Sequence, residues 1–366
     1  MTYFNFSNYF IYLFIRFLSY SCRFYISKIY YEYFLSPTIK LILMFIGESI
    51  ALFFYLYQYK YIKQGKNLFF VNFQQKKKNF SLSFIICFCG LSDLLGSCDY
   101  QYTFSYSMKN ISSKIVGFDY IILCLFVCIN ECYSLNIQIY NHQILGLILA
   151  IFPLIILFII NIDKNQQIQS FIFVVIIIIE SKFILSMLYV IEKKLNYQYF
   201  ININLLLFLE GIFGIFILLI YRFLYVFIFK MDNSFFIEIK NYKNTFELFL
   251  IFSLYIVLSF VYNFSRLRIT ELTRPSYNII GNLFCFFFQI IITSIIQKTI
   301  SKMDIIIFII SFFGFLIYCE FIILKFCNLD ENTIYKTKIR AKDDFLSIQI
   351  ELSPYQNNDL DYLFEH

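Results

Sequence analysis

The chain has 366 residues, of which 60% are hydrophobic and 15% charged, with a formal net charge of +6 and a mean hydropathy of +0.70. A soluble domain carries about 25% charged and 45–50% apolar residues, so this chain lacks the polar side chains that would cover a surface facing water. The composition counts strongly against a soluble enzyme and against a disordered protein. The modest net charge gives no reason to expect nucleic-acid binding.

Ten apolar stretches are long enough to cross a bilayer as helices, since a transmembrane helix needs about 20 mostly apolar residues. The stretch nearest the N-terminus is the weakest, because Arg16 interrupts it. It lacks a basic start and a small-residue cleavage site, so we do not interpret it as a removable signal peptide. The predicted fold is an all-α polytopic membrane protein, because barrel strands would be short and alternating. The stretches are residues 3–20, 38–58, 81–105, 110–131, 142–161, 170–190, 203–229, 247–265, 276–296 and 304–325.

Lysine and arginine residues between these spans predict the orientation. Fifteen of them fall in segments 59–80, 191–202, 266–275 and 326–366, against nine on the other side. Cytoplasmic loops carry the excess of positive charge, so both termini are expected in the cytoplasm. Residues 1–325 are predicted to form the membrane domain, and the polar segment 326–366 a mostly disordered tail.

Signals for catalysis or metal binding are missing from the sequence. The ten Cys are scattered without a pair at zinc spacing, and there are only two His. The chain also contains no GxGD, HExxH or GxSxG motif and no Gly-rich phosphate loop. We therefore expect neither an enzyme nor a bound metal or cofactor.

Ionisable residues inside the spans are the first candidates for a functional site. Each costs about 2.5–3.5 kcal/mol on insertion scales, so a chain seldom keeps one without a use for it. Six of them are acidic and two are basic. They are Glu48, Asp93, Asp99, Asp119, Glu180, Lys182, Glu210 and Arg222.

Polar residues also form stripes at helical spacing, using 100° per residue. One face of the fourth span carries Ser112, Asp119 and Asn130. One face of the sixth span carries Lys182, Ser186 and Tyr189, with Glu180 pointing elsewhere. One face of the ninth span carries Asn278, Asn282, Cys285 and Gln289. Such stripes indicate either helices around a wet cavity or hydrogen bonds between helices, the latter worth about 1 kcal/mol each.

Several stretches together resemble one family. They are residues 44–48 (MFIGE), 93–113 (DLLGSCDYQYTFSYSMKNISS), 192–193 (EK), 210–214 (EGIFG), 262–264 (YNF) and 270–273 (TELT). In their order and spacing over residues 38–325 they resemble the F subfamily of solute carrier family 35. Members of this subfamily are nucleotide-sugar-transporter-like and belong to the drug/metabolite transporter superfamily.

The resemblance implies ten helices in two inverted five-helix halves, residues 1–161 and 162–325, with substrate between them near the midplane. It also implies an endomembrane location, such as the Golgi, the endoplasmic reticulum or a lysosome-like organelle. The basic residues that relatives carry in the fourth and ninth spans are replaced here by uncharged ones. The positions that match the family pattern are Glu48, Asp93, Ser112, Ser113, Glu210, Gly211, Gly214, Asn263, Glu271 and Leu272.

The function expected from these observations is transport of a small metabolite by alternating access, with protons or cations as the candidate driving ions. The shortage of basic residues in the spans favours a neutral or cationic solute over a nucleotide sugar, with Asp119 as the proton or cation site. Lys182 is the main evidence against this choice. The expected partners are the solute, protons, the lipid bilayer and a second copy in a homodimer. The expected substrate-binding residues are Glu48, Asp93, Ser112, Ser113, Asp119, Lys182, Glu210, Asn278, Asn282 and Gln289.

Two alternatives stay open at this point. One is a polytopic membrane scaffold of the same fold that transports nothing. The other is a respiratory-complex subunit encoded in an organelle genome, which the Phe- and Ile-rich composition favours. The ordered motifs and the Lys-rich segment 59–80 count against the respiratory subunit.

Overall fold

The computed structural model gives helices over most of the residues that it describes, and no strand among them. The described residues are 6–29, 37–62, 89–91, 115–137, 139–160, 168–199, 201–229, 245–283, 302–325, 333 and 336. The elements are α1 (Phe6–Ile29), α2 (Pro37–Ser49), α3 (Ala51–Tyr57), the π-helical turn η2 (Gln58–Ile62), α6 (Ile115–Leu135), α7 (Asn141–Ile160), α8 (Ile168–Tyr199), α9 (Ile203–Phe229), α11 (Thr245–Leu272) and α13 (Lys302–Tyr318). Residues 275–283 are also helical.

Three helical stretches are long and apolar enough to cross a bilayer, as expected for a polytopic membrane protein. They are Thr38–Lys60, Ile203–Tyr221 and Phe246–Leu272. Each coincides with a predicted span, and α9 begins and ends at the predicted residues. Most of the predicted span 81–105, the second half of the predicted span 276–296 and almost all of the tail lie outside the described residues.

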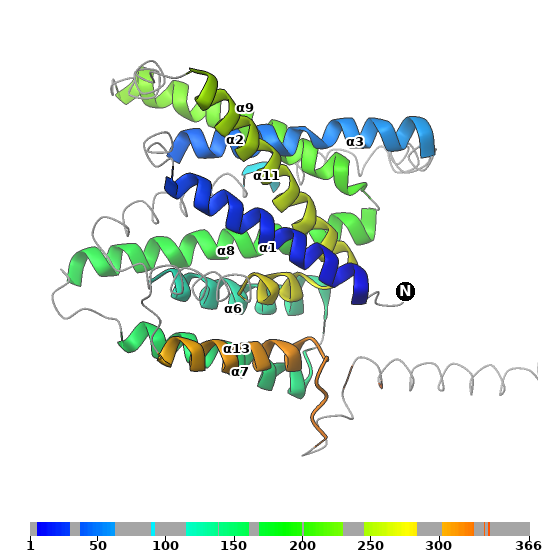
Figure 1. Ribbon diagram of the computed structural model, residues 1–366, viewed down its shortest axis with the longest axis vertical. Coiled ribbons are helices and arrows are strands. Elements are labelled where there is room, and N and C mark those ends of the chain that lie inside the picture. The colour runs from blue at the N-terminus through cyan, green and yellow to red at the C-terminus, as the bar shows by residue number, and fades with distance from the viewer. Residues whose placement is uncertain are drawn as a thin grey trace, which may run out of the picture. The chain divides into compact units, whose positions relative to one another are not determined.

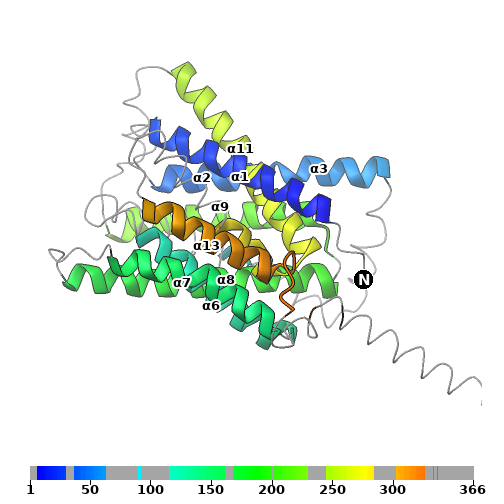
Figure 2. The ribbon, with the colours of Figure 1, turned by 60° about the horizontal axis from the view of Figure 1, so that its bottom comes forward.

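The chain divides into two units, of which the first contains residues 1–137 and 154–307. In this unit α1 packs along α11, α6 packs along α8, and α2 with α3 packs along α9 (Figure 1). Helix α11 also contacts α2, α8 and α9 (Figure 2). Helix α11 therefore packs against α1, α2, α8 and α9, whereas α6 is held in this unit by α8.

Glycines allow the close approach of α2 to its two neighbours. A Cβ atom on Gly47 would lie 2.6 Å from the carbonyl oxygen of Ile256 in α11, and one on Gly211 would lie 2.7 Å from that of Phe45 in α2. A Cβ on Gly214 would fall inside the Phe45 ring, 2.4 Å from two of its carbons. The glycines of the EGIFG stretch thus serve for helix packing, as small residues do in membrane helices.

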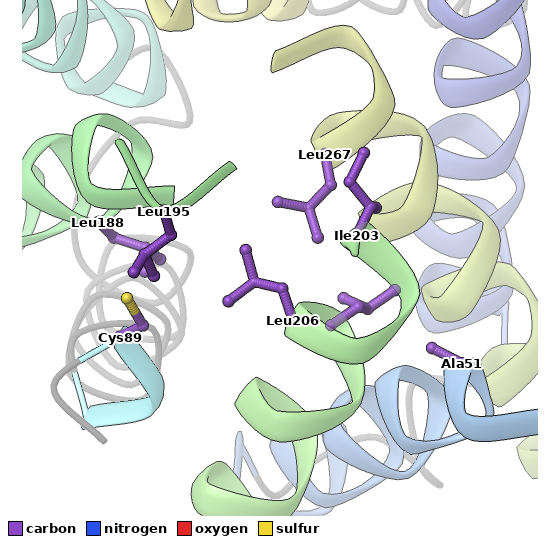
Figure 3. Close-up of a cluster of buried hydrophobic side chains, with 8 residues drawn as sticks. Ala51, Cys89, Leu188, Leu195, Ile203, Leu206 and Leu267 are labelled. Atoms are coloured by element: carbon purple, nitrogen blue, oxygen red, sulfur yellow. The ribbon is translucent and has the colours of Figure 1, made fainter. Parts of the chain in front are cut away.

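An apolar cluster joins α3, α8, α9 and α11. Figure 3 shows Leu206 and Ile203 of α9 directed toward Leu267 of α11, with Leu188 and Leu195 of α8 beside Cys89. The cluster consists of Ala51, Cys89, Leu188, Leu195, Ile203, Leu206, Leu207 and Leu267, all of them buried. It lies next to the polar residues of the same helices, so those residues are held by a packed apolar frame.

The second unit contains residues 138–153 and 308–366. Within it Gly146 of α7 and Gly314 of α13 face each other's backbone, because a Cβ on Gly314 would lie 2.3 Å from the nitrogen of Ala150. The Ser311 hydroxyl donates to the Ala150 carbonyl at 3.1 Å. At one end of this contact Nε2 of His142 lies 3.1 Å from Oε1 of Glu320.

Two segments that were predicted to be loops are helical. Helix α8 continues to Tyr199 through the predicted loop 191–202, and α11 continues to Leu272 through most of the predicted loop 266–275. Both segments were predicted to be loops because they contain basic residues. Neither contains a Gly, and the only Pro in them is Pro275 at the end of the second, so nothing in either sequence stops the helix earlier. Pro275 begins the next helical stretch, as predicted for a proline at this position.

Candidate functional site

The candidate site lies in the first unit and is built around one face of α11. Tyr262, Arg266 and Thr270 are four residues apart, so their side chains follow one another along the helix. Asn263 lies beside them and is turned toward α2. The extension of α11 beyond the predicted end of its span is what brings Arg266 and Thr270 into this row.

Arg266 is the centre of a buried ion cluster. Its Nη1 lies 2.5 Å from Oε1 of Glu192 in α8, and its Nη2 lies 3.5 Å from Oε2 of Glu210 in α9. The guanidinium also stands 5.2 Å from the centre of the Tyr189 ring. One positive charge thus faces two carboxylates, and all three side chains are buried.

Arg16 of α1 is a second buried arginine, with different partners. Its Nη1 donates to Oδ1 of Asn278, and its Nη2 donates to the Tyr262 hydroxyl at 3.2 Å. The guanidinium stands 4.8 Å from the centre of the Tyr262 ring. The amide of Asn278 in turn donates to the hydroxyl of Thr270 at 3.1 Å, which closes a polar chain from α1 to α11.

Glu48 of α2 forms a third buried contact with α11. Its Oε1 accepts a hydrogen bond of 2.5 Å from Nδ2 of Asn263. Its Cβ would lie 2.9 Å from a Cβ placed on Gly211, so Glu48 occupies the place where α2 and α9 come closest. The carboxylate is fully enclosed by these helices.

Two side chains of opposite charge bind the backbone where α11 ends and where the following helix, residues 275–283, begins. The ammonium of Lys193 in α8 donates to the carbonyl oxygens of Thr270, Glu271 and Thr273 at 2.6–2.9 Å, where α11 ends. The backbone N–H of Ser276 donates to Oε1 of Glu131 in α6 at 2.7 Å, where the next helix begins. Both charges have the sign that the adjacent helix dipole favours.

Burial changes the acidity of Lys193, which lies beyond the predicted span 170–190. Loss of solvent lowers the pKa of its ammonium to about 8, although the nearby carboxylates of Glu271 and Glu131 act in the opposite direction. The ammonium is therefore close to its titration range at a weakly alkaline pH.

The predicted faces of the fourth and sixth spans meet. Nδ2 of Asn130 in α6 donates to the Ser186 hydroxyl of α8 at 2.7 Å. Ser186 is buried together with Lys182 and Tyr189, whereas Glu180 is exposed. This confirms that Lys182, Ser186 and Tyr189 share a face from which Glu180 is excluded.

The structure describes the side chains of five predicted site residues, and all five are buried in the first unit. Glu48, Glu210 and Asn278 make the contacts given above, and Asn282 and Lys182 are buried on their helices. Asp119 belongs to α6, but its side chain lies outside the description. The other four predicted site residues lie outside the described residues altogether, namely Asp93, Ser112, Ser113 and Gln289.

Sequence reasoning missed five charged members of the site, of which Glu192 was noted only as part of the EK stretch at 192–193. Arg16 was interpreted as an interruption of the first span, and Arg266 and Lys193 as loop charges that set the orientation. Glu131 stood at the edge of its predicted span. The sequence does contain a signal for Arg266. It lies four residues after Tyr262, about one helical turn, and no proline would end a helix before position 275.

These contacts give the site a definite chemistry. It offers two buried guanidiniums, several carboxylates and amides, and two tyrosine hydroxyls, which suit a polar or charged small molecule or a proton. Among the described residues, no three His, Cys, Asp or Glu side chains are grouped to hold a metal ion. Comparison of the chain with known protein families and with curated proteins finds no match.

Proposed function

We propose that the chain is a membrane transporter that moves a small metabolite by alternating access between helical bundles. The observation that supports this proposal best is the set of buried charges around α11, which lie among helices apolar enough to cross a bilayer. Each such charge costs about 2.5–3.5 kcal/mol on insertion scales, and charges of this kind commonly mark substrate or ion pathways.

The resemblance to solute carrier family 35 adds a second line of support. Three residues of the family pattern come from three different helices, and one of them, Glu48, lies against both of the others, Gly211 and Asn263. Under this proposal the fold has about ten spans in two inverted halves. The contacts of α2, α9 and α11 would then belong to the interface that opens and closes.

The contacts around α11 also bear on the alternative of a membrane scaffold. A scaffold needs helices that pack, and apolar side chains with small residues provide that at lower cost than buried ions. The respiratory subunit is the weaker alternative, because the ordered family motifs lie in the segments that form the charged contacts.

Uptake by the purified protein in liposomes is the direct test. We expect saturable uptake of at least one member of a metabolite panel, and a clear loss of uptake in Glu48→Gln, which removes a buried charge at nearly constant volume. Glu271→Gln is the matched control, because that side chain is partly exposed and pairs within its own helix. If no solute enters faster than in empty liposomes, the scaffold is the better proposal.

The driving ion and the orientation need separate experiments. We propose a proton as the driving ion, since protonatable carboxylates lie within the helices. Uptake should then follow an imposed pH gradient and should lose this dependence in Asp119→Asn. Both termini are proposed to be cytoplasmic in an endomembrane; a cysteine at position 70 that reacts only from the lumenal side would contradict this.

A further inference from the structure

Arg16 differs from Arg266 in the partners that bind its guanidinium, which are neutral. Its guanidinium is fully buried and bonds to the amide of Asn278 and the hydroxyl of Tyr262. Its Nε is buried and has no hydrogen-bond acceptor among the residues that the structure describes. A guanidinium cannot release its charge, so this positive charge is enclosed in the protein without an ion pair to any carboxylate of the described residues.

Arg266, one turn after Tyr262 on α11, shows how the same protein compensates a buried guanidinium. It contacts the carboxylates of Glu192 and Glu210, both buried with it. Since Arg266 is provided with two anions and Arg16 with none in the described part of the chain, the vicinity of Arg16 is the more positive part of the described site. A buried charge that the chain itself does not neutralise is expected to meet an opposite charge from outside.

The Tyr262 hydroxyl supplies a second donor next to Arg16. Its oxygen accepts from Nη2 of Arg16 at 3.2 Å, so its own hydrogen remains for another acceptor. A second guanidinium, that of Arg23 in α1, stands 4.6 Å from the centre of the same ring. The two cations near this ring favour an acceptor with a negative charge.

We propose that Arg16 and Tyr262 form the binding site for one carboxylate group of the transported solute, with the Nε–H of Arg16 and the Tyr262 hydroxyl as its two donors. This inference rests on the proposed transport function and names the class of its substrate. It replaces the expectation of a neutral or cationic solute, which was drawn from the lack of basic residues in the fourth and ninth spans. The missing charge is provided by α1 instead.

The charge of the surroundings limits the solute to a single negative group. Glu48, Glu192 and Glu210 are buried on the helices that contact α11, and the guanidinium of Arg266 faces two of these three carboxylates. A second negative charge on the solute would meet these carboxylates at low dielectric. A monocarboxylate is therefore favoured over a nucleoside diphosphate.

Binding to the purified protein in detergent tests the inference without any transport. The thermal unfolding midpoint would be recorded against rising concentrations of acetate, lactate and benzoate, with glucose, choline and uridine diphosphate as comparison ligands. We expect at least one monocarboxylate to raise the midpoint in a saturable manner, and the comparison ligands to leave it unchanged. Stabilisation by uridine diphosphate alone, or by none of the six, would overturn the inference.

Two variants separate binding from a structural role of the same residues. Tyr262→Phe keeps the ring and removes one donor, so affinity should fall roughly 10- to 100-fold. Arg16→Gln should abolish binding while leaving the unfolding midpoint of the ligand-free protein unchanged or higher, because it removes an uncompensated charge. Tyr25→Phe is the matched control on α1, since its hydroxyl has no hydrogen-bond partner within the described part of the chain.

The outcomes distinguish this inference from the proposed function. If monocarboxylates bind through Arg16 but liposomes show no uptake, the site stands and the transport proposal fails. If liposomes take up a solute without a carboxylate, and Arg16→Gln transports it normally, transport stands and the carboxylate site is wrong. If Arg16→Gln lowers the midpoint of the ligand-free protein and no ligand stabilises the native chain, Arg16 only holds α1 in place.

Discussion

The contact between α7 and α13 differs from the contacts around α11 in what holds the helices together. Along the first, Gly146 and Gly314 bring two backbones together and one serine hydroxyl bonds to a carbonyl, and the carboxylate of Glu320 lies beside His142 only at one end. In the second, two arginines and several carboxylates are buried between helices of the first unit. Both contacts join apolar helices, so the need to pack does not explain the charges around α11.

This difference separates the residues that helix packing requires, such as the glycines, from the buried charges, which packing does not require. Small residues are enough to fix the distance between α7 and α13. Around α11 the chain uses glycines for the same purpose, at Gly47 and Gly211, and keeps Glu48 beside them. The additional charge is costly for stability, and we therefore assign it to function.

Replacing Arg266 by methionine should cause the greatest loss of stability. The change leaves the buried carboxylates of Glu192 and Glu210 without the guanidinium that faces them. Breaking a buried ion pair in this way costs about 3–5 kcal/mol. The free energy of unfolding, measured by denaturant titration in micelles, would report the loss, and Glu192→Gln in the same chain should restore part of it.

Arg268→Met is the control for this experiment on the same helix. Arg268 lies 2.7 Å from Glu271 but both side chains are partly exposed, so the loss should stay below about 1 kcal/mol. Equal losses in the two variants would mean that burial of the Arg266 cluster carries no special weight.

Gly314→Ala should be the next most damaging change. Its new Cβ would meet backbone atoms of α7 at 2.3–2.8 Å, and backbone cannot move aside as a side chain can. We expect a loss of about 1–3 kcal/mol from overpacking. At Gly281, by contrast, the nearest atom is the flexible end of Leu13, so Gly281→Ala should be close to neutral. Similar unfolding midpoints for both variants would refute a backbone-limited contact.

The course of the helices could be predicted where the apolar runs are long and uninterrupted. Helix α9 shows this, since its run has no proline between positions 203 and 229 and its two glycines lie in the helix interior, where they are tolerated. The ends of α8 and α11 were missed because Lys193 and Arg266 were taken as marks of the membrane boundary. A charge shows where burial becomes costly, but it does not end a helix.

Some residues of the candidate site could be predicted one by one, but Arg16 and Arg266 were missed, and none of the pairings could be predicted. Glu48, Glu210 and Asn278 were expected from their positions in apolar spans. Their partners were not, because the sequence does not say which helix faces meet. Arg16 and Asn278, for example, lie 262 positions apart. A buried contact over such a distance depends on the packing of whole helices.

Lys193→Met should weaken the end of α11 by a smaller amount. The variant loses the donor to three carbonyl oxygens, which we expect to cost about 1–2 kcal/mol at neutral pH. The pKa of Lys193 is lowered to about 8 in the folded chain, below its usual value of 10.5. Between these two values the unfolded chain binds more protons, so raising the pH stabilises the native protein by at most about 1.4 kcal/mol per unit.

The Met variant cannot gain this stability, and its deficit relative to the native chain should therefore widen from pH 8 to pH 10. Unfolding midpoints of both proteins across that range provide the measurement. A deficit that shrinks as the pH rises would show that the charged ammonium, rather than the neutral amine, is the form preferred by the carbonyl oxygens.

The hydrogen bond from Asn130 to Ser186 should have the smallest effect, and it bears on the choice between a wet cavity and bonded helices. A double-mutant cycle with Asn130→Ala and Ser186→Ala isolates the coupling free energy of this pair. A hydrogen bond between membrane helices is worth about 0.6 kcal/mol in such cycles. A coupling of this size, with transport unchanged, would show that the polar faces of α6 and α8 simply bond the helices together. A coupling near zero, with altered uptake in both single variants, would instead show that this pair serves the solute pathway, since water or solute then replaces the lost partner.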